Sequence, residues 1–389
     1  MPEPLLSVRD AEQAAAALLP RDVRDFVAGG SEAEVTLAAN RAALDAVFLT
    51  PRVLAGITAC DPGTMLVGCR SAQPVAVAPM SYQRLIHPEG EIGLARAARE
   101  AGIPLTLSMM SSCLLEEVAA VGGTLWLQLY LLRDRGQVAD LIQRAEAAGC
   151  RALMLTVDVP RMGRRLRDMR NGFALPAGIT AANLRDDTAT MVGGTSAGSP
   201  GVAVHTNQVF EPSLSWADVS WLRERTRLPL VLKGILHPAD AQRAAESGVS
   251  AVVVSNHGGR QLDGAVASIT ALPGVCEAVN GRCEVLLDSG IRSGTDVLRA
   301  LSLGAGGVLL GRPALWGLAN GGARGAAQVL SLLADELTEA MTLAGCPDIG
   351  SARLLQTTAF ATESGVRGVV PPGQHCGPVA KMTGGHQAG

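Results

Sequence analysis

Short apolar runs alternate with longer alanine-rich stretches from about residue 72 to residue 355. The apolar runs have the length and the β-branched composition of buried strands, and the stretches between them have the periodicity of amphipathic helices. Strands that alternate with helices form parallel βαβ units, and eight such units close into a (β/α)8 TIM barrel. The eight predicted strands span residues 74–80, 104–110, 124–130, 152–158, 229–234, 250–256, 283–290 and 306–312.

A doubly wound open sheet is the competing α/β architecture. The eight units are nearly even in length, and no glycine-rich dinucleotide-binding motif follows the first predicted strand. Both features favour the closed barrel. The length of 389 residues allows one large core, so we predict a single domain over residues 1–360 with the barrel at 72–355.

Three segments lie outside the repeat. Residues 1–70 contain two helix-like stretches and are expected to form a helical extension that caps the bottom or side of the barrel. Residues 172–215 are rich in Gly, Thr, Ser and Asp, and they follow the fourth strand, which predicts a lid over the active face. The Gly- and Pro-rich residues 361–389 are expected to form a flexible tail.

Composition excludes several classes of function. The formal net charge is −3 and the basic residues are scattered, so we predict no nucleic-acid partner. The eight cysteines form no CxxC pair and are expected to be reduced, and no metal site is predicted. The chain has neither a signal-like N-terminus nor an apolar run of membrane-spanning length, which predicts a soluble, cytoplasmic protein.

Polar and charged side chains stand where the predicted strands end. In parallel barrels the carboxyl ends of the strands form the active face, so these side chains are expected to converge there. They come from all eight strands: Pro79, Met80 and Ser81, then Ser108, Gln128, Tyr130, Thr156, Asp158, Arg165, Lys233, His257, Arg260, Asp288, Gly290, Arg292, Gly311 and Arg312.

The segment "SNHGGRQLDG", residues 255–264, places one histidine directly after a buried strand. His257 alone could be a core histidine. Asp158, at the end of the fourth strand, could orient one ring nitrogen while the other faces a substrate, as a general base requires. Arg165 and Arg260 could be surface charges, but two guanidinium groups beside a base favour recognition of a small carboxylate.

The ends of the last two strands favour a phosphate site. Gly290 and Gly311 can expose main-chain N–H groups, and Arg292 and Arg312 add guanidinium donors, although either arginine alone could be in a surface ion pair. Lys233 has two interpretations, a cation that stabilises negative charge on a cofactor or a Schiff-base nucleophile of an aldolase. A phosphate-binding regulatory barrel without catalysis is a third hypothesis.

Five segments together resemble the FMN-dependent L-2-hydroxy acid oxidases and dehydrogenases: "LTVDVPRMGRRLRDMRNGF", "LVLKGI", "SNHGGRQLDG", "LLDSGIRSGTDV" and "LLGRP". The similarity runs from about residue 5 to residue 355. "DFVAGG" and "YQRLIHPEGE" are most similar to the bacterial members that oxidise 4-hydroxymandelate.

The resemblance implies the (β/α)8 fold, FMN as cofactor and a role for each site residue. His257 would be the base with Asp158 as its partner, Arg165 and Arg260 would hold the substrate carboxylate, and Tyr130 would bind the substrate hydroxyl. The flavin ring would lie against Pro79, Met80 and Ser81. Its polar edge would meet Ser108, Gln128, Thr156 and Lys233, and Asp288 and Gly290 would also contact the cofactor. The phosphate would lie on Arg292, Gly311 and Arg312.

The resemblance also bears on substrate and assembly. Phe26 and Met110 stand where other family members carry a tyrosine and a tryptophan, so the pocket is expected to be more apolar than theirs. We therefore expect (S)-mandelate or 4-hydroxymandelate as substrate, with aliphatic acids such as lactate or glycolate as the alternative. We expect O2 as acceptor, with H2O2 as product, because the segment after the fourth strand is too polar to lie in a bilayer interface. The resemblance also implies a homotetramer. The polar segment 179–201 is unlike the apolar membrane anchor of some relatives.

Overall fold

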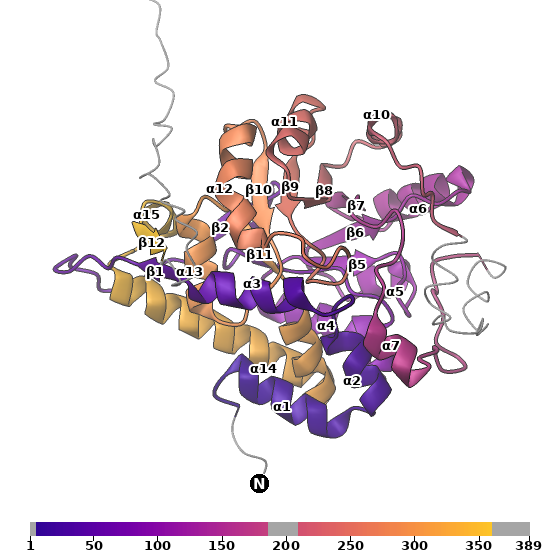
Figure 1. The fold of residues 1–389 in the computed structure, drawn as a ribbon, viewed down its shortest axis with the longest axis horizontal. Coiled ribbons are helices and arrows are strands. Elements are labelled where there is room, and N and C mark those ends of the chain that lie inside the picture. Colours follow the sequence, from indigo (N-terminus) through magenta and orange to yellow (C-terminus); the bar gives the residue numbers. More distant parts are fainter. Residues whose placement is uncertain (1–4, 186–208, 360–389) are drawn as a thin grey trace, which may run out of the picture.

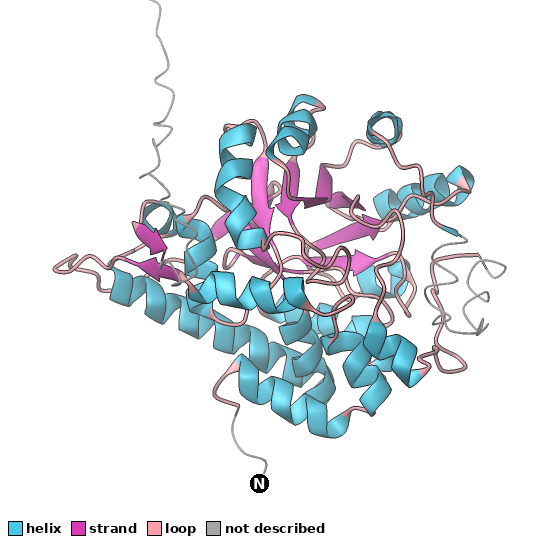
Figure 2. Ribbon diagram, in the orientation of Figure 1, coloured by secondary structure: helices cyan, strands magenta, loops and turns pink. Residues whose placement is uncertain are grey.

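The computed structural model describes residues 5–185 and 209–359, and its centre is a closed barrel of eight parallel strands (Figures 1 and 2). The strands pair in chain order, and the barrel closes where the last strand pairs with the first. They are β4 (Val75–Val77), β5 (Leu105–Ser108), β6 (Leu125–Leu129), β7 (Ala152–Thr156), β8 (Leu230–Ile235), β9 (Ala251–Val254), β10 (Glu284–Leu287) and β11 (Gly307–Leu310). The predicted TIM barrel is confirmed, and the open sheet is excluded.

Most of the strands are shorter than the apolar runs that predicted them. The first run was expected to extend to residue 80, whereas β4 ends at Val77. The sixth was expected to extend to residue 256, whereas β9 ends at Val254. The final residues of these runs leave the hydrogen-bonded ladder and turn over the mouth of the barrel, where an apolar side chain can still be buried. The apolar composition therefore located the strands correctly. The hydrogen-bonded part of each shortened strand ends before the apolar run does, where the active face begins.

Side chains alternate between the inside of the barrel and the surrounding helices. In β6, Leu125, Leu127 and Leu129 pack outward in the main core, while Trp126 belongs to the separate core inside the barrel. Trp126 is fully buried, and small residues of the neighbouring strands leave room for it. The inward positions nearest the carboxyl ends are polar: Ser108, Gln128, Thr156, Lys233, Ser255 and Asp288. This layer forms the floor of the active face.

Helices surround the barrel on the outside (Figure 2). One follows each strand in turn: α4 (Gly90–Glu100), α5 (Leu115–Ala119), α6 (Arg135–Ala147), α10 (Trp216–Arg223), α11 (Pro238–Glu246), α12 (Ser268–Val279), α13 (Gly294–Ser302) and α14 (Arg312–Ala344). Three short helices lie in connections or near the end: η1 (Gln83–Leu85), α7 (Leu166–Asn171) and α15 (Ile349–Arg353). The long α14 is kinked at Gly321 and Gly322 and packs against α4.

The N-terminal extension contains α1 (Val8–Leu18), α2 (Arg21–Ala28) and α3 (Val35–Asp45). Helix α1 packs on α14 at the side of the barrel, as expected. Helices α2 and α3 instead lie at the carboxyl ends of the strands, because α2 packs on α7 and α3 contacts the loop after β9. Polar contacts hold α3 there, because the side-chain amides of Asn40 and Asn256 exchange hydrogen bonds of 2.9 and 2.7 Å.

Two small antiparallel sheets complete the fold. Strands β2 (Thr64–Leu66) and β3 (Cys69–Ser71) form a hairpin whose Leu66 and Val67 plug the inside of the barrel. The Val67 N–H donates to Glu284 at the start of β10, which places this hairpin at the bottom. Strands β1 (Val47–Leu49) and β12 (Thr357–Ala359) pair and join the segment after α3 to the last described residues.

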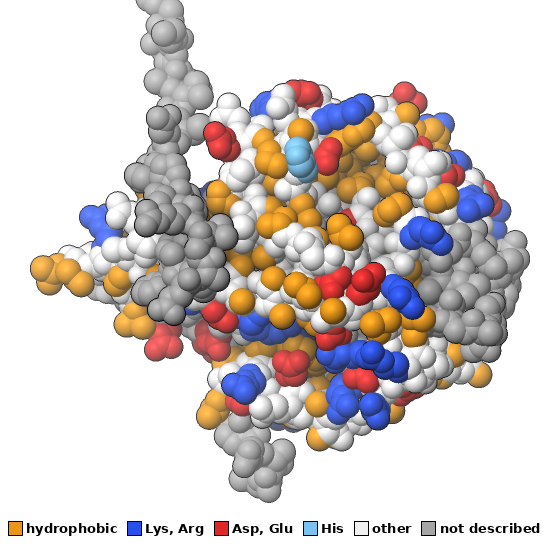
Figure 3. Space-filling view, in the orientation of Figure 1, with side chains coloured by type: hydrophobic (Ala, Val, Ile, Leu, Met, Phe, Trp, Pro, Cys, Tyr) orange, Lys and Arg blue, Asp and Glu red, His pale blue; other side chains and the backbone are white. Residues whose placement is uncertain are grey.

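Some expectations fall wholly or partly on residues that the structure does not describe. The predicted lid at 172–215 includes residues 186–208, and the predicted tail at 361–389 lies entirely outside the described residues. The seven cysteines within the described ranges are free thiols. None of the described helices is long and apolar enough to cross a bilayer. On the face shown in Figure 3, basic and acidic side chains are interspersed.

Candidate active site

A pocket opens at the carboxyl ends of the strands and encloses about 1300 Å³, counting the open space at its mouth. Its walls come from the N-terminal extension and from loops after most of the strands. Basic and apolar side chains both contribute to the lining. The lining includes Phe26, Pro79, Met80, Ser81, Tyr82, Met110, Tyr130, Met162, Arg165, Phe210, Lys233, His257, Arg260, Asp288, Gly290, Arg292, Gly311 and Arg312.

A row of hydrogen bonds crosses the floor of this pocket. The Ser108 hydroxyl donates to Gln128 Oε1 at 3.0 Å, and Gln128 Nε2 donates to Thr156 Oγ1 at 3.1 Å. Ser81 joins the row through a 3.3 Å contact between its hydroxyl and that of Ser108. The parallel register places Ser108 opposite Gln128, and Thr156 lies two residues beyond Met154, the register partner of Gln128. The floor is therefore a fixed polar surface.

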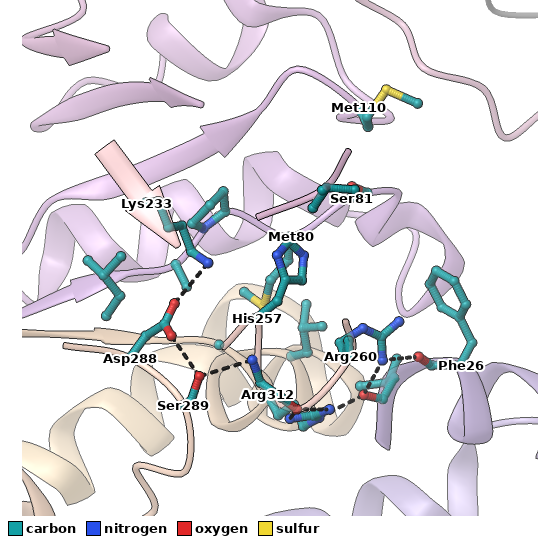
Figure 4. A pocket seen from close by; sticks show the side chains of 18 of the residues that line it. Phe26, Met80, Ser81, Met110, Lys233, His257, Arg260, Asp288, Ser289 and Arg312 are labelled. Atoms are coloured by element: carbon teal, nitrogen blue, oxygen red, sulfur yellow. Dashed lines mark hydrogen bonds and ion pairs between the residues drawn. The ribbon is translucent and has the colours of Figure 1, made fainter. Parts of the chain in front are cut away.

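Lys233 continues the floor as a buried cation. Its Nζ lies 3.0 Å from Asp288 Oδ2 and 3.0 Å from the Ser255 hydroxyl (Figure 4). Burial alone would lower the pKa of Lys233, but Asp288 and Asp158 outweigh burial and raise it. The amine is thus held protonated at neutral pH.

His257 lies between Lys233 and Arg260 in Figure 4. Its Nδ1 is 2.9 Å from Asp158 Oδ1, so the other ring nitrogen is left for a ligand. Burial lowers the pKa of His257, and the opposing effect of Asp158 does not restore it because Lys233 and Arg165 act in the same direction as burial. The pair therefore offers a neutral, oriented imidazole.

The backbone conformation of the loop after β9 explains why two glycines follow His257. His257, Gly258 and Gly259 all have positive φ, at 60°, 67° and 74°. The loop approaches α3 so closely that a Cβ on Gly259 would lie 2.7 Å from the main-chain N and Cα of Leu37. Hydrogen bonds from the His257 and Gly258 N–H groups to serine hydroxyls hold the turn. Glycine is therefore required here by backbone geometry and by space.

Arg165 and Arg260 form a pair of half-buried guanidinium groups over the Phe26 ring, at 6.0 and 5.4 Å from its centroid. Phe26 in turn stacks on Phe173, with centroids 4.5 Å apart. Burial and the charge of Arg260 lower the pKa of Arg165 to about 9, and its Nε has no hydrogen-bond partner among the described residues. Two close cations without a paired carboxylate are an unsaturated site for an anion.

Arg292 and Arg312 form a second, half-buried cationic group near the ends of β10 and β11. Arg312 donates to the main-chain carbonyls of Val27, Gly29 and Gly258 at 2.9 to 3.1 Å. Arg292 lies over the Trp316 ring at 4.8 Å. Burial lowers the pKa of Arg292 to about 10 and lowers that of Arg312 as well. Neither is in an ion pair with any carboxylate in the described ranges.

A family model described as "FMN-dependent dehydrogenase" matches residues 15–356 of this sequence. The chain belongs to this family. Its relatives include the 4-hydroxymandelate oxidase of Amycolatopsis orientalis, 54% identical over 90% of this chain and 98% of the relative. The L-lactate oxidase of a Nostoc species is 47% identical over 87% and 94%, respectively. A crystal structure of mandelate oxidase with (S)-4-hydroxymandelic acid superposes with a TM-score of 0.89 at 54% identity, covering 92% of this chain and all of that one.

The pocket of this FMN-dependent dehydrogenase fits its cofactor. The half-buried Arg292 and Arg312 are in no ion pair with a carboxylate of the described residues, and a phosphate would supply one. Above Gly311 a Cβ would find its nearest atoms at 3.8 Å, so there is room beside the main chain. The serine, glutamine and lysine groups of the floor match the polar edge of an isoalloxazine ring.

Most of the predicted site residues line this one pocket, and four do not. Ser108, Gln128 and Thr156 are buried in the floor below the lining, at most 3% exposed. Asp158 is also absent from the lining and lies behind His257. The structure thus brings all the predicted residues to one end of the barrel, with Ser108, Gln128 and Thr156 in the pocket floor and Asp158 behind His257.

Sequence reasoning missed several residues of this family member's site. Ser255 bonds both Lys233 Nζ and the His257 N–H, and only its inward position beside Lys233 signals it. Phe210 stacks on Tyr130 with centroids 4.4 Å apart, although the loop that carries it has no recognisable pattern. Tyr82 lines the pocket with its hydroxyl buried. Its place directly after Ser81 was the signal that could have found it.

Proposed function

We propose that the protein oxidises (S)-mandelate or 4-hydroxymandelate to the 2-oxo acid, with FMN as first electron acceptor and O2 as the final one. The observation that carries the proposal is the combination of a neutral His257 imidazole oriented by Asp158 with two arginines that are in no ion pair among the described residues, in a pocket that also has an apolar wall. That combination suits a small acid with a hydroxyl next to its carboxylate and an aromatic side chain.

Arg165 and Arg260 hold the substrate carboxylate in this proposal. Arg260 is itself fixed by hydrogen bonds of 2.7 and 2.8 Å to the carbonyls of Phe26 and Gly29, so its free donors are oriented before a ligand arrives. The carboxylate supplies the ion-pair partner that neither guanidinium group has among the described residues, where Asp168 acts on both without forming an ion pair. Phe26 supports both guanidinium groups from the same side.

His257 removes a proton from the bound 2-hydroxy acid, and Asp158 stabilises the imidazolium that forms. Tyr130 donates to the substrate hydroxyl; burial raises its pKa to about 12, which keeps it a donor at neutral pH. When bound, FMN supplies the two-electron acceptor. Lys233, protonated beside Asp288, stabilises the negative charge that accumulates at the edge of the pocket floor.

The aldolase hypothesis is disfavoured by the same lysine. A Schiff-base lysine must become a free amine, and burial without counter-charge is the usual way to lower its pKa. Here Asp288 and Asp158 raise the pKa of Lys233 instead. A regulatory barrel without catalysis leaves the His257–Asp158 pair without a role.

The preference for an aromatic acid rests on the apolar part of the lining, which includes Phe26, Met110, Met162 and Phe210. Burial of apolar surface is worth roughly 25 cal/mol per Å². A phenyl ring that buries ~100 Å² therefore gains about 2 to 3 kcal/mol, or roughly 30- to 150-fold over glycolate. An aliphatic substrate such as lactate remains the second candidate, because a lactate oxidase is among the relatives.

The experiment measures the visible spectrum of the purified protein and then kcat/KM for (S)-mandelate, 4-hydroxymandelate, lactate and glycolate with peroxide detection. We expect flavin absorbance, higher values for the aromatic acids and stoichiometric H2O2. Equal or higher values for the aliphatic acids would refute the aromatic preference. Colourless protein that traps substrate on Lys233 with borohydride would refute the oxidase. The homotetramer and the cytoplasmic location stay predictions, for gel filtration and fractionation to test.

A further inference from the structure

Glu91 is a buried acidic residue that the chemistry proposed above does not use. It lies in the first turn of α4, is 0% exposed and does not line the active-site pocket. Burial of a carboxyl group is costly unless hydrogen bonds to its oxygens compensate for the lost water. The donors to Glu91 therefore show which parts of the molecule it holds.

Both oxygens of Glu91 accept hydrogen bonds from segments outside α4. Oε1 accepts from the Gln83 N–H at 3.0 Å and from the Ser112 N–H at 2.9 Å. Oε2 accepts from the Ser112 hydroxyl at 2.6 Å. Gln83 belongs to the loop after β4 and Ser112 to the loop after β5. One side chain thus ties together two loops at the carboxyl ends of adjacent strands.

The strand ladder alone holds these two loops weakly. Val77 and Leu105 form the one register pair between β4 and β5, two strands that lie wholly in the described part of the chain. The next pair of strands, β5 and β6, is in register at four positions. The relative position of the two loops therefore depends on contacts beyond the ladder.

Two further hydrogen bonds join the loops. The Tyr82 N–H donates to the Met110 carbonyl at 3.1 Å, and the Arg84 N–H donates to the Ser112 hydroxyl at 3.0 Å. Tyr82 is held here in a left-handed conformation with φ 55°, which is unfavourable for a tyrosine. The Ser112 hydroxyl that accepts from Arg84 is the one that donates to Glu91, so the carboxyl group also orients this contact.

The two loops carry part of the pocket lining. Met80 and Ser81 belong to the first loop and Met110 to the second, and all three line the pocket (Figure 4). The Gln83 side chain donates to the Met80 carbonyl at 3.2 Å, so one partner of Glu91 also contacts the main chain of the lining. Met110 lies two residues before the other partner. The spacing of the loops thus decides how far apart these parts of the lining stand.

We propose that Glu91 is a positioning residue that fixes the spacing of the two loops and thereby the fit of Met110 against the aromatic ring of the substrate. The inference rests on the proposed function, in which Met80 and Ser81 meet the flavin ring and Met110 is part of the apolar wall. Because it is fully buried outside the lining, Glu91 acts through the loops and not by contact with a ligand.

The test is Glu91→Gln, which keeps the volume of the side chain but replaces one acceptor oxygen with an amide donor. Phenylacetate and propionate lack the reacting hydroxyl, so their Kd values for the flavin-loaded protein report recognition without turnover. The Kd of propionate divided by that of phenylacetate should fall at least about fivefold, because a displaced wall loses contact with the ring most. The FMN content per chain should be unchanged, since Arg292 and Arg312 are untouched.

Turnover should show the same selectivity. In Glu91→Gln, kcat/KM for (S)-mandelate should fall about tenfold, mainly through KM, while the value for lactate stays within about threefold. A purely structural role would lower Tm and leave both the Kd ratio and the mandelate-to-lactate ratio as in the parent. That result would overturn the proposal.

Glu89→Gln is the matched control. Glu89 directly precedes α4 and accepts from the Ala323 N–H at 2.8 Å, a contact with α14 that joins neither loop. Both ratios should stay at the parent's values, and an equal fall in this variant would overturn the role of Glu91. If Glu91→Gln does not fold, Ser112→Ala takes its place, because it removes the Oε2 contact alone. Unchanged ratios in Ser112→Ala would then overturn the proposal.

The parent protein separates this inference from the oxidase proposal. A parent that oxidises no 2-hydroxy acid would refute the proposed function, while the change of the Kd ratio between parent and variant would still decide the role of Glu91. An active oxidase whose two ratios do not respond to Glu91→Gln would overturn the positioning role and leave the proposed function intact.

Discussion

His257 Nδ1 lies 2.9 Å from a carboxylate oxygen of Asp158, although 99 residues separate the two in sequence. The carboxylate favours the imidazolium, while burial and Lys233 favour the neutral ring and prevail, so the pKa of His257 falls below its ordinary 6.5. The base is therefore neutral at pH 7 and loses its function only when it is protonated at lower pH.

This balance sets the acid side of the pH profile. In the parent, kcat/KM should stay level from neutrality to below pH 6.5 and then fall as His257 takes up a proton. Asp158→Asn removes the group that raises the pKa of His257, so the fall should move to lower pH while the plateau drops. Profiles of kcat/KM from pH 4.5 to 8 measure both. A fall at the same pH in the two proteins would contradict the coupling.

His257→Gln should keep FMN but lose its reduction by substrate. The imidazole acts on the substrate, and the phosphate-binding candidates Arg292 and Arg312 are untouched. General-base removal commonly costs ~10² to 10⁴ in rate. The flavin-to-protein absorbance ratio checks retention, and stopped-flow bleaching under anaerobic conditions checks the rate. Reduction at the parent's rate would disprove the assignment of the base.

Arg260→Lys should raise KM about 10- to 100-fold with a smaller change in kcat. An ammonium cannot reproduce the guanidinium fork, and it also loses the hydrogen bonds to the Phe26 and Gly29 carbonyls. Arg165→Lys is the matched control, because Arg165 contacts the same Phe26 ring but its Nε has no hydrogen-bond partner among the described residues. If only the Arg165 variant raised KM, Arg165 alone would hold the carboxylate.

Gly259→Ala should lower Tm and activity together. Its φ of 74° costs any L-residue about 1 to 2 kcal/mol, and the added Cβ would lie 2.7 Å from Leu37. Gly264→Ala is the control, because its φ is 82° but nothing lies within 4 Å of the new Cβ. Thermal unfolding should show a small loss for the control and a clearly larger one for Gly259→Ala. Equal losses of Tm in the two variants would show that the close contact with Leu37 of α3 does not contribute to the effect.

Asp296→Asn should destabilise the fold by about 3 to 5 kcal/mol near pH 7, as expected when one partner of a buried ion pair is removed. Asp296 is 1% exposed, and its two oxygens accept from Arg41 at 2.6 and 2.7 Å. Burial alone would raise the pKa of Asp296, but Arg41 and Arg299 outweigh burial and lower it below 3.8.

A carboxylate with a lowered pKa stabilises the fold above its unfolded-state pKa and loses that contribution as the pH falls through the folded-state value. The Tm difference between parent and Asp296→Asn should thus be constant from pH 7 to about 5 and shrink below pH 3.8. A difference that grows with acidification would have the wrong sign.

The barrel and most of the site were predictable because their signals are local. A buried parallel strand is apolar on both faces, and the polar residue at its last inward position, such as Gln128 or Lys233, interrupts that run visibly. His257 stood out because two glycines with positive φ must follow it. In both cases, the local structure restricts the residue types at neighbouring positions, and the sequence shows this restriction directly.

The rest depends on contacts between distant segments. Helix α2 was not predicted, and nothing in its sequence shows that the carbonyls at its end accept from Arg260 and Arg312. Phe210 is one aromatic residue in a loop, and only the folded chain stacks it on Tyr130. The orphaned hydroxyl of Tyr82 is a property of its surroundings, which no residue pattern encodes.

The hydrogen bonds from Arg260 and Arg312 to the carbonyls of residues 26–29 span 231 to 285 positions. During synthesis the chain start leaves the ribosome first, yet these acceptors gain their donors only after almost the whole barrel has been made. The pocket can therefore be completed only late in translation, when residues 26–29 meet Arg260 and Arg312. An incomplete chain would hold neither the anion sites nor the wall that Phe26 provides, so a nascent polypeptide has no premature cofactor site.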